Sequence, residues 1–457
     1  MRQVSRTAGA GLMIGRQGGP PPVAAPAPVA VAADAADDAV RFTVVVLLAS
    51  LLLQRFALPM GELPFSIVGP IGLLCGAFWM LRGTLVMDER RVIALLVLAA
   101  IGFISSLLSL TAATARLAAI SWTSLSQFLL LSLFAPLAFR QAVDEERYFK
   151  AFNACLAFVG VAGILQFFAQ LGGVFLISFV TLGVPTQYTL ESFYNIYNPT
   201  GIGGLFKSNG FFMVEASIYS QFMAMGLAIE FTYSRRIRYL AIFALGLVLS
   251  FSGTGWLIMG AFVVGAVARQ GGRGLKIGLG ALSAAGVGLG VLAVASPELF
   301  EQYVGRVGEF TTPGSSGHLR FVTPWWAMSD FMGETPWALL VGGGAGVSER
   351  LHTQFTYFYG VNTPMKIALE YGLPGLVAYL ALFLAADRTP RQSTLLAPAL
   401  MFFLFTGTYA QFPPILFPVL LITSVARLRP TPAPPSNRVR PAAAGGTLAG
   451  PALNRSR

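Results

Sequence analysis

Residues 92–110 read VIALLVLAAIGFISSLLSL, without a single charged side chain. An uninterrupted apolar run of roughly 20 residues is what an α-helix needs to cross the hydrocarbon core of a bilayer. Similar runs recur along the chain, and of its 457 residues 55% are hydrophobic and 11% charged. Mean hydropathy is +0.68. Soluble domains carry about 25% charged residues, so composition excludes an ordinary soluble enzyme and predicts an all-α polytopic membrane protein.

The apolar runs predict about twelve transmembrane helices. We expect the predicted transmembrane domain to extend over residues 41–427, with two long external gaps at about 176–208 and 297–363, the second just before the tenth span. The predicted spans are residues 41–57, 65–82, 92–110, 118–139, 152–175, 209–231, 238–252, 254–268, 276–296, 364–386, 394–410 and 413–427.

The two ends of the chain differ from this domain in composition. Residues 1–40 are rich in Ala, Pro and Gly, and residues 428–457 are rich in Pro and basic side chains. Neither can bury enough apolar surface to fold, so both are predicted to be disordered. No apolar core directly follows the first arginines, so we expect an uncleaved anchor and no signal peptide.

Positive charge is concentrated in alternate gaps. The net charge is +11, from 31 Lys and Arg against 20 Asp and Glu. Basic gap residues mark the cytoplasmic side of a membrane, so these gaps and both termini of this multi-pass protein are predicted to be cytoplasmic. The charge then meets anionic lipid and predicts no nucleic-acid partner. The gap residues are Arg82, Arg90 and Arg91; Arg140, Arg147 and Lys150; Arg235, Arg236 and Arg238; Arg269, Arg273 and Lys276; Arg388 and Arg391.

Cys75 and Cys155 both lie within apolar runs, which indicates neither a disulfide nor a metal site.

Side chains suited to chemistry gather in the second long gap. Arginines offer bidentate cations that suit phosphate or pyrophosphate, and tryptophans offer flat faces on which sugars stack. Alternatively, Arg and Trp at this depth anchor a protein at the lipid headgroups. The candidates are His318, His352, Arg306, Arg320, Trp325 and Trp326.

The stretch FKSNGFFMVEASIYS, residues 206–220, carries two further candidates. Lys207 is predicted at the external mouth of a span, and Glu215 about two turns inside it. An intramembrane acid costs roughly 2.5–3.5 kcal/mol on insertion scales, so it usually has a purpose. Glu215 is interpreted either as a general base in a substrate cavity or as a helix–helix hydrogen-bonding residue.

Two other motifs favour structural roles. Lys366 and Glu370 are four residues apart, so they share a helix face and are predicted to form an ion pair. SFSGTGW, residues 250–256, is read as a tight reversal allowed by Gly253 and Gly255. It lacks the strand context and the lysine of a phosphate-binding P-loop.

Taken in order, these segments resemble the bacterial O-antigen ligase and polysaccharide polymerase superfamily, whose members are GT-C-like membrane glycosyltransferases. The resemblance covers roughly residues 90–425 and depends on the order and spacing of loose motifs. Those motifs are FKSNGFF, SGTGW, HLRFVTPWWAM, TPWALLVGGGAG and NTPMKIALEYGLPGL, together with the long external gap and the number of spans.

The resemblance implies a site on the periplasmic side, where glycan moves from undecaprenyl pyrophosphate to an acceptor without metal, nucleotide or other cofactor. It implies pyrophosphate-binding roles for Lys207 and Arg320. An arginine followed after ten residues by glycine, as described in the family's polymerases, matches Arg306 and Gly317. Glu215 or His318 would then take the acceptor's proton. The expected partners are an undecaprenyl-pyrophosphate-linked oligosaccharide and membrane lipid, with a chain-length regulator as a candidate protein partner.

One departure from the family's sequence pattern distinguishes between its polymerases and its ligases. Ligases of the family carry a His-Asn pair where this chain has Val361 and Asn362, with His352 nearby as a substitute. The sequence therefore favours a polymerase of exopolysaccharide or O-antigen, with an O-antigen ligase as the alternative. A lipid-oligosaccharide flippase or secondary transporter is the alternative of another class. Transporters usually show two related halves, and no internal repeat is evident here.

Overall fold

The computed structural model describes residues 28–60, 63–111, 120–200, 203–295, 297–305, 308, 311–334, 337–354 and 361–429, and these residues are mostly helical. Each predicted apolar run overlaps a helix. The helices of this bundle are α1 (Pro28–Leu52), α2 (Val68–Leu81), α3 (Glu89–Thr111), α4 (Trp122–Ser132), α5 (Glu145–Leu171), α6 (Ala216–Thr232), α7 (Ile237–Leu249), α8 (Gly253–Ala295), α14 (Thr363–Leu384), α15 (Pro390–Thr394), α16 (Leu396–Leu400), η4 (Met401–Phe405), α17 (Pro413–Leu420) and η5 (Leu421–Val425).

Three helices of the described chain are long and apolar enough to cross a membrane. They cover Glu89–Leu110, Glu145–Leu171 and Thr363–Leu384. The other predicted spans coincide with shorter or interrupted helices, and α8 contains a break at Gly271, between the two spans predicted there. Membrane crossing by these helices stays a prediction.

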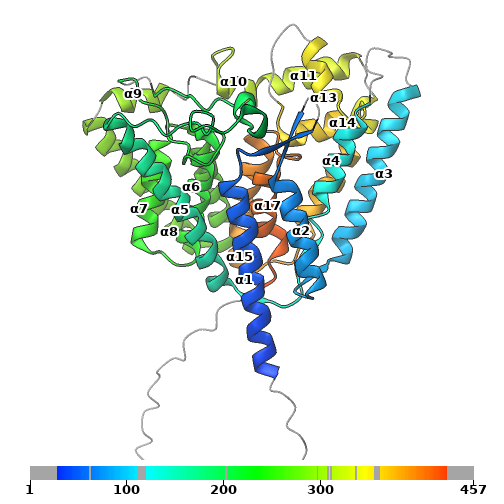
Figure 1. The fold of residues 1–457 in the computed structure, drawn as a ribbon, viewed down its shortest axis with the longest axis horizontal. Helices are drawn as coiled ribbons and strands as arrows, with labels where there is room; N and C mark the ends of the chain where they lie inside the picture. Colours follow the sequence, from blue (N-terminus) through cyan, green and yellow to red (C-terminus); the bar gives the residue numbers. More distant parts are fainter. Residues whose placement is uncertain are drawn as a thin grey trace, which may run out of the picture.

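Helix α6 occupies the interior of the bundle and packs against α5, α7 and α8. Its side chains are buried along almost its whole length. Close packing is possible because Gly226 faces α7, where an added Cβ would lie 2.7 Å from the ring of Phe243. On the other side, α1 runs beside α17, α2 and α5 (Figure 1). Helix α6 is therefore held in place by α5, α7 and α8.

Short strands join the helix ends. The described residues contain three two-stranded sheets: β1 (Ala57–Met60) with β2 (Leu63–Ser66), β3 (Leu85–Met87) with β4 (Leu137–Phe139), and β5 (Val143–Asp144) with β6 (Leu428–Arg429). An all-α prediction omits them because a strand of two to four residues leaves no readable alternation in the sequence.

Two boundaries of the predicted disordered ends are wrong. Helix α1 begins at Pro28, so residues 28–40 are helical, and Leu428 and Arg429 form strand β6 on β5. The helix extends beyond the apolar run because Ala-rich sequence continues toward its start, and alanine is the best helix former. Residues 1–27 and 430–457 lie outside the described part.

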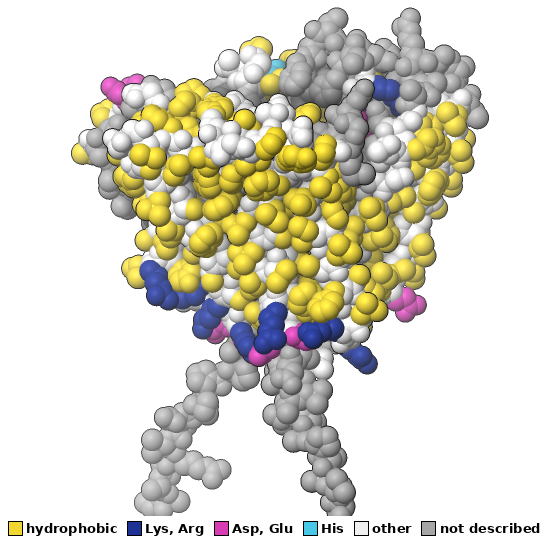
Figure 2. Space-filling model, in the orientation of Figure 1, with side chains coloured by type: hydrophobic (Ala, Val, Ile, Leu, Met, Phe, Trp, Pro, Cys, Tyr) yellow, Lys and Arg dark blue, Asp and Glu magenta, His cyan; other side chains and the backbone are white. Residues whose placement is uncertain are grey.

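The outer surface is apolar around its middle and basic at one end. Figure 2 shows hydrophobic side chains covering the wall and Lys and Arg side chains gathered at the lower end, where α1 begins. Exposed apolar side chains such as Leu74 (70%) and Leu81 (90%) would be unfavourable in water over so large an area. The opposite end carries the short helices of the second long gap (Figure 1): α9 (Pro297–Gly305), α10 (Ser316–Phe321), α11 (Thr323–Glu334), α12 (Ala338–Val341) and α13 (Val347–Gln354).

The glycine-rich loop 342–346 fits against a break in α14. Gly372 has a left-handed φ of 70°, which interrupts that helix. The N–H of Gly343 donates to the Leu369 carbonyl at 2.7 Å, and the N–H of Gly344 donates to the Glu370 carbonyl at 3.0 Å. Carbonyls freed by the break thus find partners in the loop.

Replacing Gly372 by alanine is expected to destabilise the protein, because an added Cβ would lie 2.5 Å from the Leu340 carbonyl oxygen. Gly173→Ala is the matched control: Gly173 also has a left-handed φ, 79°, but nothing lies within 4 Å of the added Cβ. Thermal unfolding in detergent should show Gly372→Ala to be less stable than the control by about 1–3 kcal/mol. Equal stability of the two variants would mean that α12 does not lie close against the break in α14.

Candidate functional site

The structure brings Arg320 and Glu215 into direct contact. The Arg320 Nη2 atom lies 3.2 Å from Glu215 Oε2, although the residues are 105 positions apart. Arg320 is in the last turn of α10, and Glu215 immediately precedes α6. Their side chains are 24% and 20% exposed, so the pair is neither buried in the core nor free in solvent. Solvent therefore reaches part of each side chain.

Glu215 lies at the head of α6, and its predicted position two turns inside a helix is wrong. The cause is a polar anchor from α5: Gln166 Oε1 accepts the N–H groups of Asn209 and Phe211, both at 3.1 Å. Phe211 takes a left-handed φ of 63°. These bonds hold residues 208–215 out of helical geometry, so the helix begins at Ala216.

Aromatic residues stand beside the pair. Tyr194 contacts the ring of Phe412, with 5.8 Å between centroids, and Tyr409 contacts the same ring at 6.3 Å. Burial raises the pKa of Tyr194, and the neighbouring Glu215 charge raises it further. The Tyr194 hydroxyl therefore stays protonated at neutral pH.

His318 is on the same short helix as Arg320 but faces a different neighbour. Its ring is 5% exposed and meets Trp326 edge to face, with 5.1 Å between centroids. His318 Nδ1 makes no hydrogen bond within the described residues. Trp326 and Trp325 are 49% and 63% exposed. The two indoles are therefore accessible beside the Arg320 helix.

The other predicted site residues have varied positions. Lys207 is half-buried, and its backbone N–H donates to the Asn198 carbonyl at 2.8 Å. Asn362 caps α14, where its Oδ1 accepts the N–H of Met365 at 3.1 Å. His352 belongs to α13, but its side chain lies outside the described part, as does the whole of Arg306.

A second charged cluster connects α13 with α14. Lys366 Nζ lies 2.9 Å from Glu370 Oε1, which confirms the predicted pair, and 3.3 Å from Glu349. Ser348 Oγ donates to Glu370 at 2.7 Å. Because Lys366 and Glu370 are both buried, the cluster holds the end of the second long gap onto the bundle.

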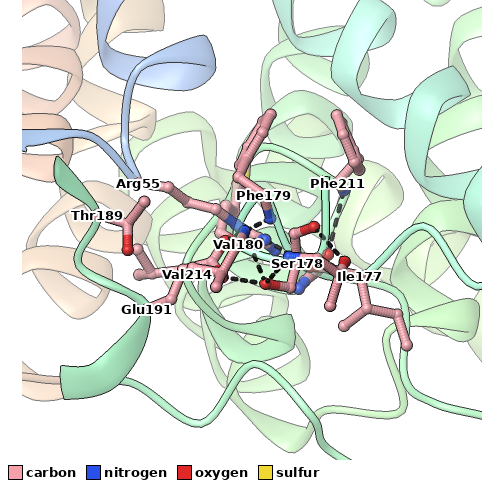
Figure 3. A network of polar contacts seen from close by, with 12 residues as sticks. Arg55, Ile177, Ser178, Phe179, Val180, Thr189, Glu191, Phe211 and Val214 are labelled. Atoms are coloured by element: carbon pink, nitrogen blue, oxygen red, sulfur yellow. Dashed lines mark hydrogen bonds and ion pairs between the residues drawn. The ribbon is translucent and has the colours of Figure 1, made fainter. Parts of the chain in front are cut away.

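A third polar centre fixes the first long gap to the end of α1 (Figure 3). Arg55 is fully buried: its Nε donates to the Met213 carbonyl at 2.7 Å and its Nη1 to Glu191 Oε1 at 3.1 Å. Nη1 also donates to the Ile177 carbonyl at 2.5 Å. The Arg55 guanidinium and the Glu191 carboxylate thus form an ion pair away from solvent.

Arg55 was not among the predicted site residues, although the sequence contains a signal. Arg55 lies near the end of the apolar run 41–57, on the side of the membrane where basic residues should be absent, because the arginine-bearing gaps alternate. An arginine on that side needs a partner, and Glu191 in the next long gap supplies it. By binding Met213, Arg55 also supports the backbone that leads into Glu215.

Within the described residues, no three or more His, Cys, Asp or Glu side chains are grouped so that they could hold a metal ion.

No protein-family model matches the chain, and neither curated proteins nor solved structures give a match.

Proposed function

We propose that the chain is a multi-pass protein of the bacterial inner membrane with about twelve spans. The apolar wall in Figure 2 would face lipid, and the basic end would be cytoplasmic by the positive-inside rule. Helix α1 begins at that end, and β6 pairs with β5 next to the start of α5. Both termini would then be cytoplasmic, and helices α9 to α13 would be periplasmic.

We further propose that the protein is a polymerase of exopolysaccharide or O-antigen. The contact between Arg320 and Glu215 carries this proposal, because it joins a cation suited to a diphosphate with a carboxylate suited to a proton. Arg320 belongs to the HLRFVTPWWAM motif and Glu215 follows the FKSNGFF motif by three residues; both motifs carry the resemblance to the ligase and polymerase superfamily. The exposed faces of Trp325 and Trp326 are suited to stacking on sugar rings.

The proposed reaction is a direct displacement. A hydroxyl oxygen of one lipid-linked repeat unit attacks the anomeric carbon of the glycan on a second lipid, and the bond from that carbon to the pyrophosphate oxygen breaks. The hydroxyl proton passes to Glu215, with His318 as the other candidate base, and undecaprenyl pyrophosphate leaves with the bonding electron pair. Attack from the opposite face inverts the anomeric carbon.

Cations would stabilise the leaving group. Charge develops on the pyrophosphate as the bond breaks, and donors fixed in advance act most strongly there. Arg320 is assigned this role, with Lys207 and Arg306 as further binders of the diphosphate. The reaction as proposed uses no metal or nucleotide.

Polymerase is favoured over ligase by Val361, because the family's ligases carry a histidine at that position. Asn362, which follows it, caps α14. If the protein is a ligase, His352 on α13 is the residue to mutate next.

A deletion strain separates the candidate functions. Surface and secreted glycan, lipid A core and undecaprenyl-linked intermediates would be resolved by gel and mass spectrometry. We expect single repeat units without long chains. Full-length chains retained on undecaprenyl pyrophosphate would instead identify a ligase. Repeat units trapped on the cytoplasmic side would indicate a flippase, and both outcomes contradict the polymerase proposal.

A further inference from the structure

Glu215 is hydrogen-bonded to one hydroxyl group, that of Ser217, and the Ser217 backbone is itself held by further hydroxyls. Ser217 Oγ donates to Glu215 Oε2 at 2.7 Å. The Ser217 carbonyl in turn accepts the hydroxyls of Ser220 at 2.6 Å and Thr254 at 3.2 Å. Thr254 Oγ1 also lies 3.0 Å from Ser252 Oγ. Two segments distant in sequence, residues 215–220 and 252–254, therefore meet through four hydroxyl groups.

The SFSGTGW turn brings Thr254 to this position. The left-handed residue of the turn is Phe251, with φ 48°, although Gly253 and Gly255 were expected to allow the reversal. Gly255 has another role: an added Cβ there would lie 2.7 Å from the Ser220 carbonyl oxygen. The missing side chain lets α8 touch the first turns of α6, which places the Thr254 hydroxyl on Ser217.

The two oxygens of Glu215 have different surroundings. Oε2 receives both protein donors, Ser217 Oγ and Arg320 Nη2. Oε1 accepts no hydrogen bond from the described residues, and the side chain is 20% exposed. A carboxylate with one oxygen fixed and the other open is oriented toward an incoming proton donor.

We propose that Thr254 and Ser217 are positioning residues that direct Oε1 of Glu215 to the acceptor hydroxyl. This inference rests on the proposed function. Thr254 fixes the Ser217 backbone, Ser217 and Arg320 bind Oε2, and Oε1 receives the proton. Small misplacements of a catalytic group reduce rate more than affinity, because the reacting atoms must lie within about 3–3.5 Å.

The test compares Thr254→Val, which removes only the hydroxyl, with Thr254→Ser, which keeps it. Thr232→Val is the matched control, because Thr232 is a buried hydroxyl of α6 bonded to the Ala228 carbonyl. For purified protein in liposomes, Thr254→Val should lower kcat about tenfold and leave KM within about twofold. Thr254→Ser and the control should both stay near wild type. Ser217→Ala should behave like Thr254→Val.

A second readout does not depend on glycan transfer. Glu215 would be coupled to glycine ethyl ester with a water-soluble carbodiimide, and its modification rate measured by peptide mass spectrometry at fixed pH. Thr254→Val and Ser217→Ala should change that rate several-fold, on the order of the kcat effect, whereas Thr254→Ser and Thr232→Val should not.

Unchanged labelling and kcat in Thr254→Val would overturn the inference, as would a Thr254→Ser variant as slow as Thr254→Val. If the wild-type protein makes no polymer but labelling still responds to Thr254, the proposed function is wrong and the hydroxyl contact to Glu215 stands.

Discussion

Arg320→Ala is expected to lower polymer output by about 10²–10³-fold, the loss typical when one preorganised donor to a developing charge is removed. Among the described residues, Arg320 is the cation that contacts Glu215. Its removal takes away the proposed donor to the leaving group and leaves Ser217 as the one donor to Glu215 Oε2. Polymer length and yield would be measured by gel in a deletion strain carrying each variant, with expression checked by immunoblot.

Arg427→Ala is the matched control for that variant. Arg427 pairs with Asp88 at 3.4 Å in an ion pair whose cation is more exposed than Arg320, and it lies just before β6. Exposed pairs contribute about 0–1 kcal/mol, so the control should keep wild-type polymer. Arg320→Lys should recover little activity, because an ammonium cannot bind a diphosphate through two parallel donors. Normal polymer in Arg320→Ala would remove Arg320 from the site.

Arg55→Ala is expected to reduce the free energy of unfolding by about 3–5 kcal/mol, because it leaves Glu191 buried without its cation. The side chains of Arg55 and Glu191 are 0% and 4% exposed, so water cannot replace the lost partner. The carbonyls of Met213 and Ile177 would lose their donor as well. Thermal unfolding in detergent measures the loss.

A double variant separates the ion pair from the packing. Arg55→Met combined with Glu191→Leu removes both charges and keeps apolar volume, so it should be more stable than Arg55→Ala. If the double variant is the less stable of the two, the carbonyl contacts of Arg55 outweigh the charge pair. An Arg55→Ala protein as stable as wild type would show that the centre in Figure 3 does not hold the loop.

Much of the helical architecture was predictable from hydropathy, because apolar runs and helices coincide. The ends of helices were harder to predict. Helix α1 starts at Pro28 because alanine-rich sequence extends it beyond the apolar run, and α6 starts at Ala216 because Gln166 binds the preceding backbone. The second cause is a contact with a residue about 45 positions away, which no local pattern contains.

The candidate site was predictable in residue type but not in pairing. Arg320 and Glu215 were each singled out, yet their contact depends on how α10 lies over α6. Lys366 and Glu370 paired as predicted because helix periodicity alone places them together. Thr254 was assigned to a structural turn, and only the packing of Gly255 on Ser220 reveals its connection to Glu215.

The most direct test is polymerisation by purified protein in liposomes supplied only with undecaprenyl-pyrophosphate-linked repeat units. Chain length and released undecaprenyl pyrophosphate would be followed by mass spectrometry for wild type, Arg320→Ala and Glu215→Gln. We predict that wild type lengthens the glycan, releasing one lipid diphosphate per bond formed, and that both variants do so at least about 100-fold more slowly. Equal elongation by all three proteins, or none by wild type under conditions where the repeat unit is intact, would contradict the account.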